Sequence, residues 1–184
     1  PTGGGPIYGI FACSQKYLRQ MPGRVVGQSW DSDSKLAFTL TLSTREQHIR
    51  RHKATSNICS NETLIALMGS IHMSLLGPEG LNKLSMRIAA NTRILQNHIS
   101  SIDELKIQFP DSPHFREIAI KLPGNASELL EFLDSRGILG GFDLGMWWKD
   151  KEDMLLIGVD ERTKKSDIEL LTNEISEWLV NKDE

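Results

Sequence analysis

The carboxy-terminal part of the sequence alternates between short apolar runs and amphipathic stretches, and this order constrains the fold more than any other feature. Apolar residues at every second position predict strands, and apolar residues at helical spacing predict helices. In chain order the predicted elements are strands at 105–109 and 118–122, a helix at 127–136, a glycine-interrupted strand at 138–144, a strand at 154–159 and a helix at 166–180. Such an order is typical of a two-layer α+β fold.

The preceding part of the chain has a different order of predicted elements. Residues 24–30 and 36–42 predict a strand pair joined by a polar turn. Two helices follow at 58–75 and 81–99, separated by Gly77-Pro78, since glycine often ends a helix and proline often begins one. The first helix is apolar over much of its circumference, so we expect it to be well buried.

The stretch from Arg45 to Lys53 is strongly basic, with four cations and one glutamate, in a chain whose net charge is -3. Thr55, Ser56 and Asn57 follow at the expected start of a helix, where backbone N–H groups also attract anions. This pattern predicts a surface that faces an anion, without choosing among phosphate, carboxylate, nucleic acid and an acidic partner. A solvated face, or a salt-bridged face between subunits, is the alternative.

Several classes of function lack support in the sequence. No aromatic residues interleave with the basic stretch, so we expect no nucleic-acid binding. His48 and His52 have a metal-ligand spacing, but Ile49 stands where a zinc protease has glutamate and neighbouring cations repel a metal, so no metal site is predicted. No apolar run reaches the ~18 residues of a membrane span. Only two cysteines are present, which favours a reducing, cytoplasmic setting.

Two remaining features have simpler interpretations. Cys59 lies near a predicted helix start, but no activating residue can be assigned, so we expect a small buried side chain. Trp147-Trp148 could form a binding platform, although we expect a place in the core or an interface. Neither a phosphate-binding glycine loop nor a nucleophile elbow is found in the sequence, and no catalytic residue is assigned.

Taken together, several segments resemble the glycine cleavage system P-protein family. They are residues 22–27 (PGRVVG), 40–42 (LTL), 44–51 (TREQHIRR), 53–59 (KATSNIC), 75–81 (LLGPEGL) and 137–141 (GILGG), in the family's order. The similarity is to the amino-terminal half, which many bacteria and archaea make as a separate subunit 1. That subunit is more than twice this length and this chain begins at Pro1, so we expect a carboxy-terminal fragment.

The resemblance implies the small C-terminal domain of a type I pyridoxal-phosphate-dependent transferase fold, preceded by the tail of the large domain. Residues 1–60 would be that tail, and residues 61–184 the helical linker and small α+β domain. The implied reaction decarboxylates glycine and transfers the aminomethyl group to the lipoyl arm of the H-protein. Pyridoxal phosphate is the implied cofactor, with its Schiff-base lysine on subunit 2, and this fragment alone would be inactive.

By the same resemblance, a small group of residues would form the wall of the cofactor and glycine pocket near subunit 2. They are Arg45, His48, Thr55, Ser56 and Asn57. Lys53 does not match the Schiff-base motif. The sequence departs from the family at Ile7-Tyr8, where His-Leu is usual, and at His52, where Glu is usual. A free-standing ligand-binding or interaction domain with the same small-domain fold is the alternative function.

Overall fold

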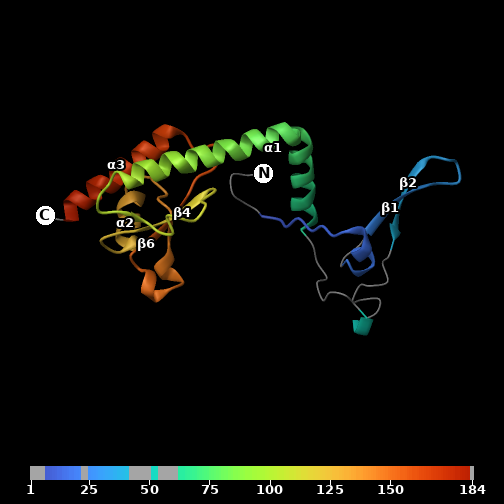
Figure 1. Cartoon of the computed structure of the whole chain (residues 1–184), viewed down its shortest axis with the longest axis horizontal. Coiled ribbons are helices and arrows are strands. Elements are labelled where there is room, and N and C mark those ends of the chain that lie inside the picture. The colour runs from blue at the N-terminus through green and yellow to red at the C-terminus, as the bar shows by residue number, and fades with distance from the viewer. Residues whose placement is uncertain (1–6, 22–24, 42–50, 54–61, 183–184) are drawn as a thin grey trace. The chain divides into compact units, whose positions relative to one another are not determined.

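The structure is a computed structural model that describes residues 7–21, 25–41, 51–53 and 62–182. Contacts divide the chain into two compact units, an amino-terminal unit within residues 6–71 and a carboxy-terminal unit within residues 72–184. Figure 1 draws the described residues of both units. The proposed domain boundary near residue 60 is a family-based assignment that this division does not test, so it stays a prediction.

The carboxy-terminal unit contains an antiparallel four-stranded sheet with the strand order β3-β4-β6-β5. Its strands are β3 (Lys106–Ile107), β4 (Glu117–Lys121), β5 (Phe142–Asp143) and β6 (Met154–Gly158). The central pair places Ile118 opposite Ile157 and Ile120 opposite Leu155. All four of these side chains are buried, because the period-two pattern directs them to one face of the sheet.

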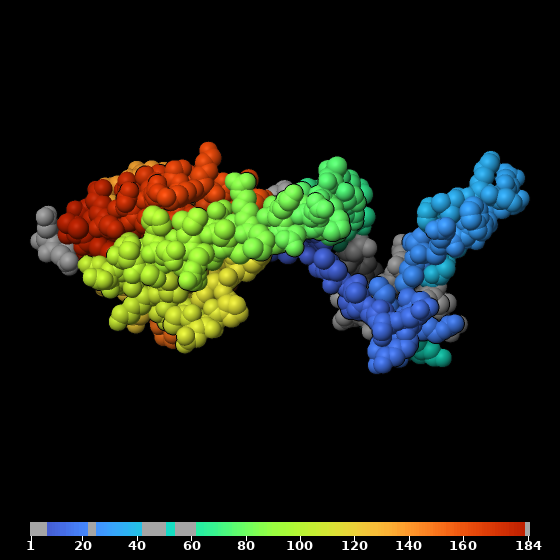
Figure 2. Space-filling model, turned by 45° about the horizontal axis from the view of Figure 1, so that its top comes forward, coloured from blue at the N-terminus to red at the C-terminus, as the bar shows by residue number. Residues whose placement is uncertain are grey.

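Three helices supply the other side of this core: the second segment of α1 (Thr63–Ser100), α2 (Ala126–Asp134) and α3 (Lys165–Lys182). Figures 1 and 2 show the end of α1 and α3 side by side. Their buried residues form one cluster with the sheet: Leu95, Ile99, Leu129, Leu133, Ile168, Ile175 and Leu179. The predicted mixture of strands and helices, in the predicted order, is therefore confirmed for this unit.

A single glycine divides α1 into two segments. Gly77 has φ 62° and ψ -179°, and Pro78 begins the second segment. This conformation is essentially restricted to glycine, because a β-carbon would clash with the backbone. The predicted break at Gly77-Pro78 is therefore confirmed.

In the amino-terminal unit, β1 (Val25–Trp30) and β2 (Leu36–Thr41) form the predicted antiparallel hairpin. The Asp31 carboxylate closes the turn by accepting hydrogen bonds from the backbone N–H groups of Asp33 (2.9 Å) and Lys35 (2.8 Å). The 3-10 helices η1 (Gln15–Gln20) and η3 (Arg51–Lys53) and the start of α1 complete the described part of this unit.

The prediction that the first segment of α1 is well buried was wrong for the described residues. Leu64, Leu67 and Ile71 are exposed, and Leu75 is 82% exposed. The apolar pattern correctly indicated a helix with a surface to cover, but in this chain that surface faces solvent.

By length and composition alone, α1 could cross a membrane. The sequence pattern had predicted no segment of this kind. Little of its apolar window is buried in the structure. The helix is interrupted at Gly77, and a single helix of this kind is weak evidence, because helices that pack in the core of a protein pass the same test.

The loop between β6 and α3 contains Asp160, whose carboxylate has a lowered pKa. Partial burial alone would raise the pKa of Asp160, but hydrogen bonds from Arg162 and Thr163 outweigh it and hold the pKa below its ordinary value. Asn91 of α1 donates to the carbonyl oxygens of Asp160 and Thr163, both at 3.0 Å. The loop thereby fixes the second segment of α1 against the sheet.

We predict that Gly77→Ala lowers the free energy of unfolding by about 1–3 kcal/mol, because the substituted residue is strained at positive φ. Beyond the local backbone, a β-carbon at this position meets no atom within 4 Å, so the cost comes from the local backbone conformation and not from a clash with a packed neighbour. Urea unfolding measures the change. Met86→Ala, at an exposed position of the same helix, should change stability by less than about 0.5 kcal/mol; equal losses in both variants would contradict the explanation.

We predict that Asp160→Asn lowers the free energy of unfolding by about 1 kcal/mol at neutral pH. The depressed folded-state pKa gives stability that is present above the unfolded pKa of about 3.9 and is lost as pH falls through the folded value. Urea titrations at pH 7 and at about pH 2.5 should therefore show a difference between variant and parent that shrinks in acid. Asp150→Asn, at an exposed carboxylate, is the control, and a loss independent of pH would refute this account.

Candidate functional site

The site residues suggested by the sequence lie outside the described residues. These are Arg45, His48, Thr55, Ser56 and Asn57. Their role in a cofactor and glycine pocket stays a prediction.

The described remainder of the basic stretch is the 3-10 helix η3, made of Arg51, His52 and Lys53. All three side chains are exposed. No salt bridge within the described ranges neutralises Arg51 or Lys53, so both cations are available to an anion. Exposed cations can attract a phosphate or carboxylate, but an enclosed pocket needs further walls.

Metal binding finds no support among the described residues, because no three of their His, Cys, Asp or Glu side chains are grouped as metal ligands. Cys13 is exposed and has a free thiol. Cys59, like His48, lies outside the described residues. The Asp31 carboxylate accepts two hydrogen bonds within its turn.

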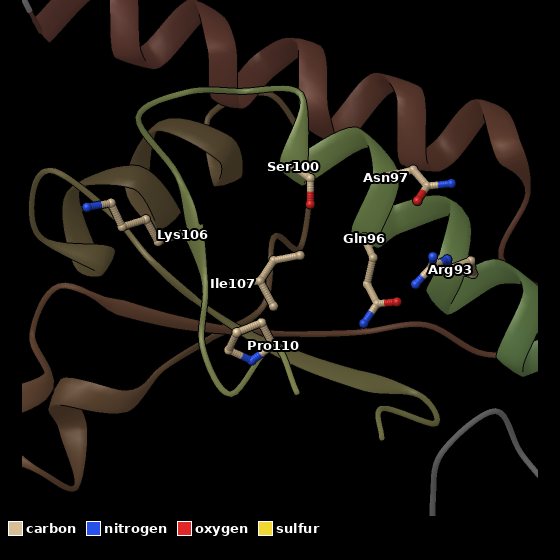
Figure 3. Close-up of a pocket in the computed structure, with 7 residues that line it drawn as sticks. All are labelled: Arg93, Gln96, Asn97, Ser100, Lys106, Ile107 and Pro110. Carbon is tan, nitrogen blue, oxygen red and sulfur yellow. The ribbon is translucent and has the colours of Figure 1, made fainter. Parts of the chain in front are cut away.

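An open polar groove lies between α1 and the edge strand β3 in the carboxy-terminal unit (Figure 3). Its volume is about 530 Å³. Four polar residues of α1 line one side, and three residues of β3 and the following loop line the other: Arg93, Gln96, Asn97, Ser100, Lys106, Ile107 and Pro110. Sequence reasoning missed this groove, although the polar spacing at 93, 96, 97 and 100 places these residues along one side of a helix.

The tryptophan pair does not belong to the core. Trp147 is 72% exposed and Trp148 is 52% exposed. The ring of Trp147 lies 5.0 Å from that of Phe142 and 5.8 Å from that of Trp148, measured between centroids. Of the two places expected for the pair, the core is therefore excluded and an interface stays a prediction; the cluster forms an aromatic surface beside β5.

The hairpin in the amino-terminal unit also presents an apolar surface. Cross-strand pairs Val26–Leu40 and Trp30–Leu36 lie on the same side of the ribbon as Phe38. All five side chains are exposed, with Trp30 and Phe38 at 68%. A two-stranded ribbon of this kind needs a further surface to cover its apolar face.

A family profile described as "Glycine cleavage system P-protein" matches residues 1–175. A "Probable glycine dehydrogenase (decarboxylating) subunit 1" from Caulobacter sp. (strain K31) is 45% identical over 97% of this chain and 40% of that protein. A protein of the same description from Desulfovibrio desulfuricans is 42% identical over 94% of this chain and 39% of its own length.

The fold agrees with these relatives. A crystal structure of glycine decarboxylase (P-protein) of the glycine cleavage system, in inhibitor-bound form, superposes with a TM-score of 0.79 at 32% identity. The match covers 89% of this chain and 37% of that one. The architecture is therefore that of a segment of a glycine decarboxylase. The chain belongs to the glycine cleavage system P-protein family, and it spans about two fifths of the length of the curated relatives that it matches.

Proposed function

We propose that this chain forms part of subunit 1 of a glycine decarboxylase of the glycine cleavage system. The proposed reaction decarboxylates glycine and transfers the aminomethyl group to the lipoyl arm of the H-protein. One observation carries the proposal: similarity to proteins described as subunit 1 extends over nearly the whole chain, at 45% identity over 97% of its residues. No observation favours the alternative of a free-standing binding domain.

At the level of domains, we propose that residues 61–184 are the helical linker and small α+β domain of a type I pyridoxal-phosphate fold. Residues 1–60 would then be the tail of the large domain. The four-stranded sheet with helices packed on it supports the first assignment. The exposed apolar face of the hairpin supports the second, because a large domain would cover it.

The described residues fit pyridoxal phosphate only in part. Arg51 and Lys53 are exposed cations of the kind that attract a phosphate, but their exposure means that other walls must enclose the cofactor. Arg45, His48, Thr55, Ser56 and Asn57 are the residues that we propose for one of these walls. When bound, pyridoxal phosphate supplies an electron sink for the carbanion formed by loss of carbon dioxide from glycine.

The proposed contribution of this chain is binding and orientation. Arg45 can form a two-pronged contact with the glycine carboxylate or a phosphate, since guanidinium geometry matches either anion. Thr55, Ser56 and Asn57 can donate hydrogen bonds that fix the same anion. Excess positive charge in this stretch would favour binding of the glycine carboxylate.

Subunit 2 is the proposed partner that carries the Schiff-base lysine, and the lipoyl H-protein is the proposed acceptor. We include neither nucleic acid nor a membrane among the proposed partners. The small number of cysteines favours a reducing compartment, so cytoplasmic localisation is part of the proposal.

Spectral titration with pyridoxal phosphate tests where the lysine lies. We expect this chain alone to give no Schiff-base absorption, and full-length subunit 1 mixed with subunit 2 to give it. Borohydride reduction followed by peptide mass analysis locates the modified lysine. A reduced adduct on a specific lysine of this chain would overturn the assignment of the lysine to subunit 2.

Arg45→Ala and Asn57→Ala, made in full-length subunit 1 assembled with subunit 2, test the proposed wall. Loss of a hydrogen bond to a charged group costs about 1.5–3 kcal/mol, so we expect KM for glycine to rise, or turnover to fall, by about tenfold or more. Arg87→Ala, at an exposed arginine of α1, is the matched control and should leave both constants unchanged. Unchanged glycine affinity and turnover in the Arg45 and Asn57 variants would exclude these roles.

A further inference from the structure

An open apolar pocket lies beside the carboxy-terminal end of α2 in the carboxy-terminal unit. Its volume is about 330 Å³, and its walls come from α2 and from the loop at 138–141 that leads into β5. Leu130 and Ile138 line the pocket and pack against the buried core, whereas Leu139 is 96% exposed. The pocket therefore runs from the edge of the core to a leucine side chain that nothing in the described structure covers.

Two glycines hold the loop close to its neighbours. A β-carbon on Gly140 would overlap the side chain of Leu133, and a β-carbon on Gly141 would overlap the carbonyl oxygen of Leu156 in β6. Gly141 also has φ 146°, a conformation that other residues rarely adopt. The loop thus lies against α2 and β6 without intervening side chains, so the pocket is a preformed part of the fold.

Two carboxylates without a counterion belong to this pocket. Glu131 and Asp134 lie three residues apart on α2, where β-carbons are about 5–6 Å apart, so a single cation can lie near both. Both residues line the pocket and are exposed, which places them at its mouth. Neither forms a salt bridge with a residue that the structure describes, and no basic residue is among the lining residues.

The cation nearest to them in the sequence is held on another side of α2. Arg136 forms ion pairs with Glu174 and Glu177 of α3, both at 2.7 Å. Its guanidinium carbon also lies 3.7 Å from the ring centroid of Phe132. Phe132 and Asp134 are two positions apart and so lie on nearly opposite sides of a helix. Arg136 therefore leaves the carboxylates of the pocket to an external cation.

Apolar walls with negative charge at the mouth favour a particular kind of ligand. A long basic side chain matches both parts, because its methylene stem covers apolar surface while its charged end stays near water. A metal ion would need more oxygen ligands than two carboxylates, and no group of three candidate ligands occurs among the described residues. A metal ion or a small amine would also leave Leu139 uncovered.

We propose that this pocket binds a segment of a partner protein in which an arginine or lysine stands next to an apolar residue. The basic side chain lies across Leu130 and Ile138 with its charged end near Glu131 and Asp134, and the apolar neighbour covers Leu139. The proposal does not rest on the glycine decarboxylase reaction, because the proposed cofactor pocket uses none of these residues.

The test is a saturation-transfer NMR titration of the full-length protein that contains this chain. Two peptides of equal length are compared, one with a Leu-Arg-Leu core and one with a Leu-citrulline-Leu core, since citrulline keeps the shape of arginine without its charge. We expect saturable binding of the arginine peptide with a dissociation constant on the order of 0.1–1 mM, because a short peptide loses much freedom on binding. The citrulline peptide should bind about fivefold more weakly. Absence of saturation, or equal binding of both peptides, would overturn the proposal.

Variants separate the pocket from general attraction by negative charge. Glu131→Gln and Asp134→Asn should each weaken binding of the arginine peptide by about two- to fivefold, the usual effect of an exposed ion pair. Asp111→Asn removes the same charge from an exposed position outside the pocket and should leave the affinity unchanged. Leu139→Ser should weaken binding of both peptides. Equal weakening by Asp111→Asn would show non-specific attraction and reject the pocket.

Two further measurements distinguish other occupants of the pocket. Ca²⁺ added to the peptide complex at the peptide's own concentration should leave the peptide bound, and displacement would indicate a metal site. Sedimentation of the full-length protein should give the same mass for the parent and for the variant that combines Glu131→Gln with Asp134→Asn. A lower mass for the variant would indicate an interface between copies of the protein. Either of these results would overturn the assignment to a basic segment of a different protein.

Discussion

The second segment of α1 is held against the sheet by two polar side chains, and the rest of the carboxy-terminal unit depends on this attachment. Thr92 is buried and donates a hydrogen bond to the carbonyl oxygen of Phe115 at 2.6 Å, just before β4. The neighbouring Asn91 fastens the loop that leads into α3. Burial makes such bonds costly to lose, because an unpaired polar group in the core has no water to replace its partner. They fix the rotation of the helix, so that Leu95 and Ile99 face the core and Arg93 faces the groove.

Much of this unit could be predicted from the sequence, because period-two and helical patterns are local. β4, β6 and α3 lie close to their predicted positions. The pattern at 105–109 predicted a longer strand than β3, but Phe109 has φ 54° and is exposed, since the chain already turns there. The predicted helix began at residue 127, whereas α2 begins at Ala126 after an extended Asn125. Turns and helix ends depend on contacts with distant residues, which local patterns do not record.

The candidate sites show a different limit of sequence reasoning. Family membership could be inferred from short motifs, because residues 44–51 and 53–59 form an unusual combination. The groove could not be predicted, since its two walls come from separate elements that only tertiary packing brings together. Polar residues at positions 93 and 97 are typical of the solvent side of a helix, and nothing local indicates that β3 lies alongside. The sequence could not decide between a core and an interface position for Trp147 for the same reason: an aromatic pair next to a strand does not specify which face it occupies.

The two units differ in whether their own residues bury enough apolar surface to stabilise them. The carboxy-terminal unit encloses a buried apolar cluster between one sheet and three helices, so packing within the unit stabilises it. The β1–β2 ribbon has its apolar face toward solvent, and two strands alone bury too little surface to offset the entropy lost on ordering. The stability of the ribbon therefore depends on a further surface that covers Val26, Trp30 and Phe38, which we assign to the rest of the proposed large domain. Unfolding of that domain would release the ribbon, whereas the carboxy-terminal unit has a buried core of its own.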